Sequence, residues 1–209
     1  DTDNNTKIQV EESPNEDIIR YDMGGTEYFR MKQGRLEVLN TGSSVFIGQS
    51  AGLFDDLSFN YNVGIGAEAL RLNTLGSENT ATGFRSLYSN SIGVKNTASG
   101  YESLFFNAEG TYNTAAGYRS MDLNFSGDYN TAFGAEALGG NSGGNYNTGL
   151  GYRADVFAAN QNNATAIGAN ARVDQSNSLV LGSIAGVNGA TENVNVGIGS
   201  PLDLANNDG

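Results

Sequence analysis

The segments NTASGYESLFFNAEGTY (96–112), NTAAGYRSMDLNFSGDY (113–129) and NTAFGAEALGGNSGGNY (130–146) are three successive copies of one 17-residue pattern. Each copy begins with Asn-Thr-Ala, has a glycine at its fifth position and carries Asn-x-x-Gly in its second half. Self-similarity at a short fixed period is typical of a repeat architecture. This period is the strongest indication of the fold.

Motifs related to the start of the pattern extend in both directions along the chain. The glycines that close them lie 17 residues apart from Gly66 to Gly168, after a first step of 18 and before steps of 14 and 17. The ten glycines are Gly48, Gly66, Gly83, Gly100, Gly117, Gly134, Gly151, Gly168, Gly182 and Gly199. Nearly the whole of 41–199 therefore belongs to one array.

The repeat predicts an all-β fold, a parallel β-solenoid (β-roll) of about nine to ten coils. A helix-turn-helix repeat needs about 33 residues, and Asn and Gly in every unit disfavour helices. Two short strands with tight Asn/Gly turns fit 17 residues. Each strand is expected to pair in parallel with its copy in the next coil, about 4.8 Å away.

Composition excludes several classes of function. The 209 residues include no His and no Cys, and the net charge is −12. Disulfides, cysteine zinc sites and Ser-His-Asp triads are therefore absent, and we expect no enzymatic activity, no metal site and no cofactor. The chain has few clustered basic residues, which argues against nucleic acid as a partner. It contains no run of about 20 apolar residues, so we expect no membrane insertion.

A charged column provides internal evidence that the coils stack in register. The residue two after each glycine alternates in sign over six coils, which favours stacked pairs of opposite charge. These residues are Glu68, Arg85, Glu102, Arg119, Glu136 and Arg153. A second column is all Asn, and we interpret it as a structural amide ladder of the kind seen in cross-β stacks; polar ligand binding is the alternative. It consists of Asn62, Asn79, Asn96, Asn113, Asn130 and Asn147.

Other columns leave alternatives open. A threonine column runs from Thr80 to Thr165, but no regular Thr-x-Thr face accompanies it, which disfavours ice binding. The Ala/Gly face of the strand is expected to meet either the opposite wall of the roll or a second subunit. Strict alternation would place Glu102 and Leu104 on one side, so a bend or an interface is expected there. Aromatic residues after the glycine are candidate contact residues for a partner: Phe84, Tyr101, Tyr118 and Tyr152.

The two ends of the chain do not repeat. Residues 1–40 read as four short strands separated by turns, which indicates a β-meander that acts as a cap or connector, or donates a strand to a neighbour. Residues 200–209 read as a tail. Asp55 and Asp56 interrupt the first coil, and solvation of this acidic loop is favoured over cation binding.

The units NTASGYESL, NTAAGYRSM and NTAFGAEAL resemble the head repeats of trimeric autotransporter adhesins, the YadA-like heads, over about 44–199. Similar repeats occur in tail-fibre and surface proteins of bacteria and phages. The resemblance implies a left-handed parallel β-roll in which three chains wind side by side. The 17-residue period departs from the 14 or 15 residues usual in that family, and only the step from Gly168 to Gly182 matches it.

These observations predict an extracellular fibre or adhesin head at a bacterial surface, a homotrimeric rod for adhesion or spacing. Its partners would be further copies of itself and a host-surface protein or glycan. One alternative is the receptor-binding tail fibre of a phage or contractile injection system. Another is a self-assembling filament subunit that uses residues 1–40 for end-to-end contact.

Overall fold

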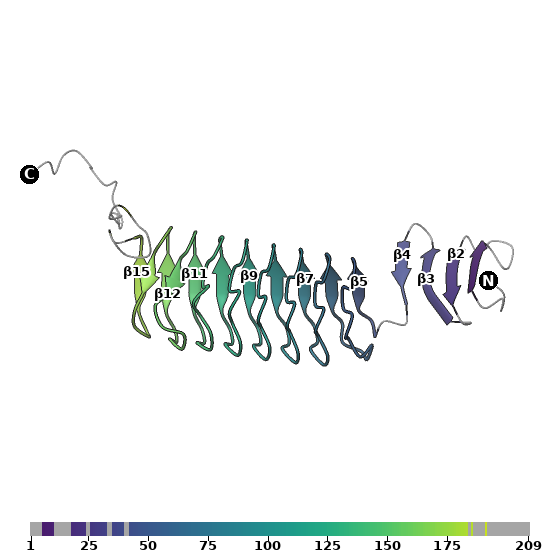
Figure 1. Cartoon of the computed structure of the whole chain (residues 1–209), viewed down its shortest axis with the longest axis horizontal. Coiled ribbons are helices and arrows are strands. Elements are labelled where there is room, and N and C mark those ends of the chain that lie inside the picture. The colour runs from purple at the N-terminus through teal and green to yellow at the C-terminus, as the bar shows by residue number, and fades with distance from the viewer. Residues whose placement is uncertain are drawn as a thin grey trace, which may run out of the picture.

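The computed structural model describes residues 6–10, 18–23, 26–32, 35–39, 42–183, 185 and 191. Within these residues it is an all-β structure without helices, and it shows a rod of stacked coils beside a small sheet (Figure 1). The small sheet is an antiparallel meander in the order β1-β2-β3-β4, as the sequence predicted. Its strands are β1 (Thr6–Val10), β2 (Ile18–Met23), β3 (Thr26–Lys32) and β4 (Arg35–Val38).

The rod is a parallel β-solenoid of about eight turns with a repeat of about 17 residues. One nine-stranded sheet runs along it, with every strand paired in parallel to the next in the order β15-β13-β11-β10-β9-β8-β7-β6-β5. Its strands are β5 (Val45–Ile47), β6 (Val63–Ile65), β7 (Thr80–Thr82), β8 (Thr97–Ser99), β9 (Thr114–Ala116), β10 (Thr131–Phe133), β11 (Thr148–Leu150), β13 (Thr165–Ile167) and β15 (Leu179–Leu181). The tenth motif, NVGIG at 195–199, lies outside the described residues.

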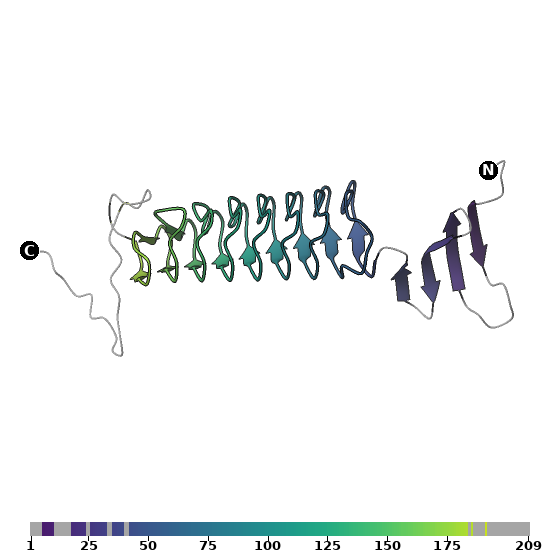
Figure 2. The same ribbon diagram turned by 90° about the horizontal axis from the view of Figure 1, so that it is seen from below.

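The register confirms that residues 17 apart are stacked. Thr97 is opposite Thr114, and Ala98 is opposite Ala115, with the same offset in the neighbouring coils. Figure 2 shows the coils as similar loops that follow one another along the rod. Two further short strands, β12 (Asp155–Val156) and β14 (Arg172–Val173), pair in parallel on another side of the last coils.

The core is a narrow column of small and aliphatic side chains inside the roll. The central residue of each strand from β6 to β11 and of β13 is buried, whereas Phe46 in β5 and Val180 in β15 are partly buried. The buried Leu/Met column lies behind these strands. A Cβ added at Gly149 would lie 2.8 Å from Leu138 Cγ, which shows how closely the strand and the opposite wall approach. The Ala/Gly face therefore meets the opposite wall of the same roll. The buried column is Leu70, Leu87, Leu104, Met121 and Leu138.

A bend in each coil explains how a charged and a buried residue can be two positions apart. Glu102 and Leu104 both have φ of 50°, in the left-handed region that side chains other than Gly, Asn and Asp rarely adopt. These two turns break the strict alternation, so that Leu104 is fully buried while Glu102 stays partly exposed. The same pair of positive φ angles recurs at Arg85 and Leu87.

The glycine after each strand is required for two reasons. Gly100 has φ of 138°, and a Cβ there would lie 2.4 Å from the carbonyl oxygen of Gly117 in the next coil. Only glycine combines that backbone conformation with such close stacking. The recurrence of this glycine therefore follows from the spacing of the coils.

Candidate functional site

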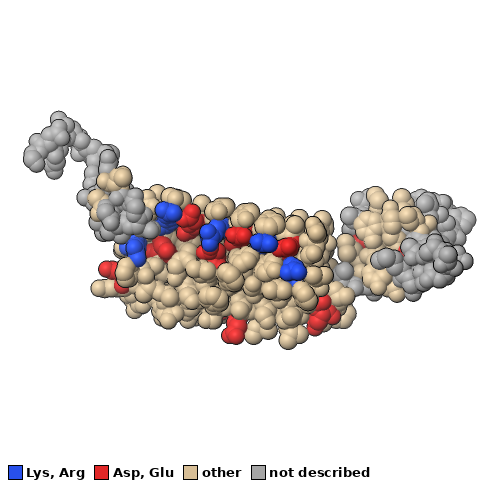
Figure 3. Space-filling model, viewed as in Figure 1, with Lys and Arg blue, Asp and Glu red and all other residues tan. Residues whose placement is uncertain are grey.

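The charged column lies on the outside of the rod as one stripe (Figure 3). Arg85 Nε contacts Glu68 Oε2 at 2.7 Å, and its Nη1 lies 3.9 Å from Glu102 Oε1. Arg153 Nε contacts Glu136 Oε2 at 2.7 Å. The alternation of sign thus corresponds to ion pairs between coils.

The stripe changes its pairing at Arg119. This guanidinium lies 3.7 Å from Glu102 through Nε, but its Nη2 contacts Asp122 Oδ2 at 2.6 Å within its own coil. No Arg119–Glu136 ion pair occurs among the contacts of the described residues. Asp122, which the sequence analysis did not single out, is therefore part of the charged surface.

The predicted Asn column lies entirely inside the rod. Asn113 N–H donates to Asn96 Oδ1 at 3.0 Å, and Asn113 Nδ2 donates to the Gly127 carbonyl at 2.7 Å. The same two bonds recur at Asn79, Asn96, Asn130 and Asn147, with small changes in length. Full burial and satisfied partners assign this column a structural role, because unpaired buried amides are costly.

A second amide ladder was missed by the sequence analysis. Asn107 Nδ2 donates to Asn90 Oδ1 at 2.8 Å and to the Gly110 carbonyl at 2.9 Å. Its Oδ1 accepts from Asn124 Nδ2 at 2.8 Å. The fixed Asn-x-x-Gly group was the available signal, since both residues recur in the same register. The ladder consists of Asn73, Asn90, Asn107, Asn124 and Asn141.

Three of the four candidate aromatic residues form one stack. The rings of Phe84 and Tyr101, and of Tyr101 and Tyr118, are stacked with centroids 5.3 Å apart. The stack stops at Ala135, and Tyr152 lies one coil beyond it. A separate stack of Tyr112, Tyr129 and Tyr146 has centroid distances of 4.8 and 5.1 Å. Stacked rings turn their edges outward, so most ring faces in these columns are covered.

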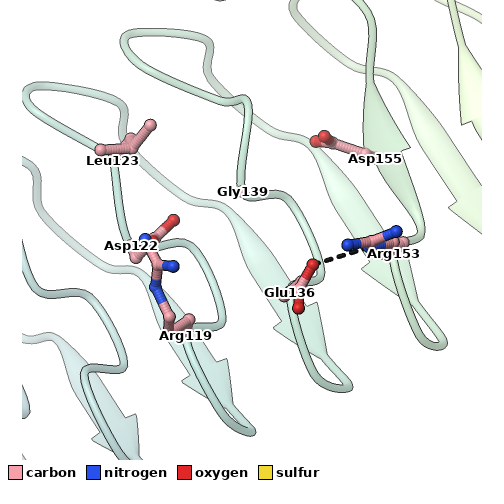
Figure 4. Close-up of a pocket in the computed structure, with 7 residues that line it drawn as sticks. All are labelled: Arg119, Asp122, Leu123, Glu136, Gly139, Arg153 and Asp155. Atoms are coloured by element: carbon pink, nitrogen blue, oxygen red, sulfur yellow. Dashed lines mark hydrogen bonds and ion pairs between the residues drawn. The ribbon is translucent and has the colours of Figure 1, made fainter. Parts of the chain in front are cut away.

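A hollow of about 330 Å³ opens beside the charged stripe (Figure 4). We call it the Gly139 hollow, after the glycine at its floor. Arg119 and Asp122 border it on one side, and Arg153 and Asp155 border it on the other. Its lining residues are Arg119, Asp122, Leu123, Glu136, Gly139, Arg153 and Asp155.

Burial shapes the electrostatics of the hollow. It raises the pKa of Asp155, while hydrogen bonds from Val156 N–H and Gly140 N–H and the charge of Arg172 act in the opposite direction. Burial also raises the pKa of Asp122, against the pull of Arg119. The charge of Asp122 further raises the pKa of Asp155, and the charge of Glu102 further raises the pKa of Asp122.

The acidic loop at the start of the rod has a structural role. Asp55 is 9% exposed and accepts hydrogen bonds from the side-chain amides of Asn60, Asn62 and Asn73. Asp56 Oδ1 accepts from Ser58 N–H at 3.0 Å. Among the described residues no group of three or more acidic, His or Cys side chains could hold a metal ion.

No protein-family model, curated protein or solved structure matches the chain. The structure supports the resemblance to adhesin heads only as far as the parallel β-solenoid, whose repeats are about 17 residues long. This repeat fold is consistent with a structural or fibrous protein. In the part of the chain that the structure describes, no helix has the length and hydrophobicity to cross a membrane.

Proposed function

We propose that the chain is a non-enzymatic extracellular rod, the head of an adhesin or a spacer at a bacterial surface, which assembles laterally as a homotrimer. The fold supports an elongated and cohesive body, because hydrogen bonds of the sheet and of two amide ladders connect every coil to the next. A rod of this kind presents repeated columns of side chains along its length. Such columns suit contact with an extended partner or with parallel copies.

The observation that carries the proposal is an apolar column on the outer face of the sheet. Four consecutive strands, β10, β11, β13 and β15, place their last residue side by side. Phe133 is 50% exposed, and Ile167 and Leu181 are each 38% exposed. The column consists of Phe133, Leu150, Ile167 and Leu181. Contiguous apolar surface of this kind marks interaction sites, and lateral packing of rods would bury it.

The thin core supports the same conclusion. Much of the interior consists of alanine, small residues and amide ladders, with one buried Leu or Met in each of five coils and a buried Val in later ones. A narrow roll buries little apolar area for its length, so association adds burial that the single chain lacks. The number three follows from the resemblance to adhesin heads.

Light scattering over a range of protein concentrations tests the assembly. A fixed mass of three chains is expected for the wild type. The double variant Phe133→Thr/Ile167→Thr, which introduces the residue that the same column holds at Thr82, is expected to dissociate. The variant Thr80→Ser on a distant strand is the control and should keep the trimer. A stable wild-type monomer would overturn the trimeric rod, and a mass that climbs without limit would indicate a filament.

A further inference from the structure

One coil of the rod has Ala or Gly at three positions where other coils carry larger side chains. Ala135 lies between Tyr118 and Tyr152 in its column. Gly139 lies between Asp122 and Val156 in a column that holds Phe105 and Tyr88 two and three coils earlier, and Gly140 lies between Leu123 and Phe157. Each of these residues is 17 positions from its neighbour, so the missing side chains belong to one coil. Of the three positions, Gly139 is the one that lines the hollow.

The hollow is one coil wide. Its two walls belong to coils that lie two steps apart along the rod. Their separation is about 9.6 Å, because neighbouring coils are about 4.8 Å apart. The vacated step is close to the thickness of one pyranose ring. Its volume of about 330 Å³ lies at the small end of the range for ligand pockets. These dimensions suit one or two rings of a chain that crosses the rod.

The polar groups of the hollow alternate between donors and acceptors. Arg119 and Arg153 supply guanidinium donors, each already oriented by a carboxylate at 2.6 or 2.7 Å. Asp122, Glu136 and Asp155 supply acceptors, and Asp122 is only 7% exposed. Side chains held in place by such pairs lose little freedom on binding a ligand. The hollow is thus preorganised for a ligand that both donates and accepts hydrogen bonds.

The mixture of charges selects against ionic ligands. An anion would meet three carboxylates, and a cation would meet two guanidinium groups. A neutral polyhydroxyl compound has no such conflict, because each hydroxyl can donate to a carboxylate and accept from a guanidinium. Leu123, which lines the hollow and is 40% exposed, adds apolar surface, which suits the C–H faces of a sugar ring.

We propose that the Gly139 hollow binds a ring of a neutral saccharide, which makes a surface glycan the ligand of the adhesive rod. This inference rests on the proposed adhesive function and specifies its ligand. The charged stripe then provides the polar groups of one local site within coils 113–163.

Binding of neutral oligosaccharides to the full chain tests the proposal. The immobilised probes are hexasaccharides of glucose, galactose, mannose and N-acetylglucosamine, with oligogalacturonate and chitosan hexamers as the anionic and cationic probes. Gly139→Tyr refills the column with the residue found at Tyr88, and a Cβ there meets nothing closer than 3.4 Å. Glu78→Tyr adds the same ring to a distant column that already holds Tyr112, with matching φ angles of 58° and 57°. Arg153→Gln removes a donor at an exposed position without filling the hollow.

We expect at least one neutral hexasaccharide to bind, with affinity reduced tenfold or more by Gly139→Tyr and Arg153→Gln and unchanged by Glu78→Tyr. Binding of none, or equal binding by Gly139→Tyr, would overturn the site. Preference for the anionic or cationic probe would overturn the ligand class. Beads coated with each variant separate this result from the adhesive function. If wild-type and Gly139→Tyr beads adhere equally to an epithelial cell layer, adhesion stands without the hollow, and if neither adheres, the adhesive function itself fails.

Discussion

The carboxylate of Asp55 accepts a hydrogen bond from Asn73 Nδ2 at 3.1 Å, and this contact ends the chain of amide bonds inside the rod. Every amide in that chain donates toward Asp55, from Asn141 through Asn124 and the intervening residues. The 18-residue first step places Asp55 in the register of the ladder. An aligned row of dipoles therefore ends on a negative charge, an arrangement that strengthens hydrogen bonds in series.

Removal of one rung of the ladder should be costly. The variant Asn107→Ala leaves Asn90 Oδ1 and the Gly110 carbonyl without the donor that they share, and Asn124 Nδ2 loses an acceptor. Each buried unsatisfied group costs about 1–3 kcal/mol, so we expect a loss of about 3 kcal/mol in the free energy of unfolding by urea. Thr97→Ala, exposed in the same coil, should change it by less than about 0.5 kcal/mol. Equal effects would contradict the ladder.

Replacement of the carboxylate at the end of the ladder should destabilise the rod, because both of its oxygens accept hydrogen bonds. Asp55→Asn turns one acceptor oxygen into an NH₂ group that faces the amides of Asn62 and Asn73. We expect a loss of about 1–2 kcal/mol, concentrated in the first coil. Hydrogen exchange should show faster exchange of the amides near 62–66 and unchanged exchange near 113–117. A uniform change along the rod would contradict a local role.

The repeat made the coil and its register predictable, but not the assignment of each column to inside or outside. The 17-residue period and the alternating charges at Glu68 and Arg85 depend only on stacking, which acts equally in every coil. By contrast, the positive φ angles at Glu102 and Leu104 arise from closure of the roll, which overrides the preferences of these residues. Strict alternation therefore fails at this bend.

The hollow could not be predicted from the repeat alone. Gly139 and Gly140 depart from the bulky residues of their columns, which is visible in the sequence once the columns are aligned. Whether the vacated space stays open depends on neighbouring side chains, such as Asp122 pairing with Arg119 within its own coil. A repeat pattern describes what coils share, whereas a binding site consists of what one coil does differently.

Reversal of one charge in the stripe should produce a salt-dependent loss of stability. Arg85→Glu replaces a cation between Glu68 and Glu102 by a third carboxylate. Because these side chains are 19–38% exposed, we expect only a small loss of stability, measurable at low ionic strength. Addition of 1 M NaCl should remove most of it by screening. Glu68→Arg in the same chain should restore part of the loss, and failure of salt to reduce the effect would contradict its electrostatic origin.

The partly buried carboxyl of Asp155 should make the rod less stable as the pH rises. Its pKa is raised in the folded chain mainly by burial, so the folded state holds the proton more tightly than the unfolded state does. Stability therefore falls as the pH increases from the unfolded pKa of about 3.9 through the folded value. In Asp155→Asn the urea midpoint should fall less between pH 4 and pH 7 than in the wild type. Part of the decline of the urea midpoint should remain in this variant, because the pKa of Asp122 is also raised in the folded chain.

Asp56 provides a control of opposite sign for this pH dependence. Hydrogen bonds from Ser58, mainly from its backbone N–H and also from its side chain, hold the pKa of Asp56 below its usual value. Ionisation of this exposed residue therefore contributes stability that is lost as the pH falls through the folded pKa. Asp56→Asn should therefore make the decline of the urea midpoint from pH 4 to pH 7 steeper, whereas Asp155→Asn should make it shallower. If both substitutions shift the slope in the same direction, then burial of Asp155 is not what sets the pH dependence of the rod.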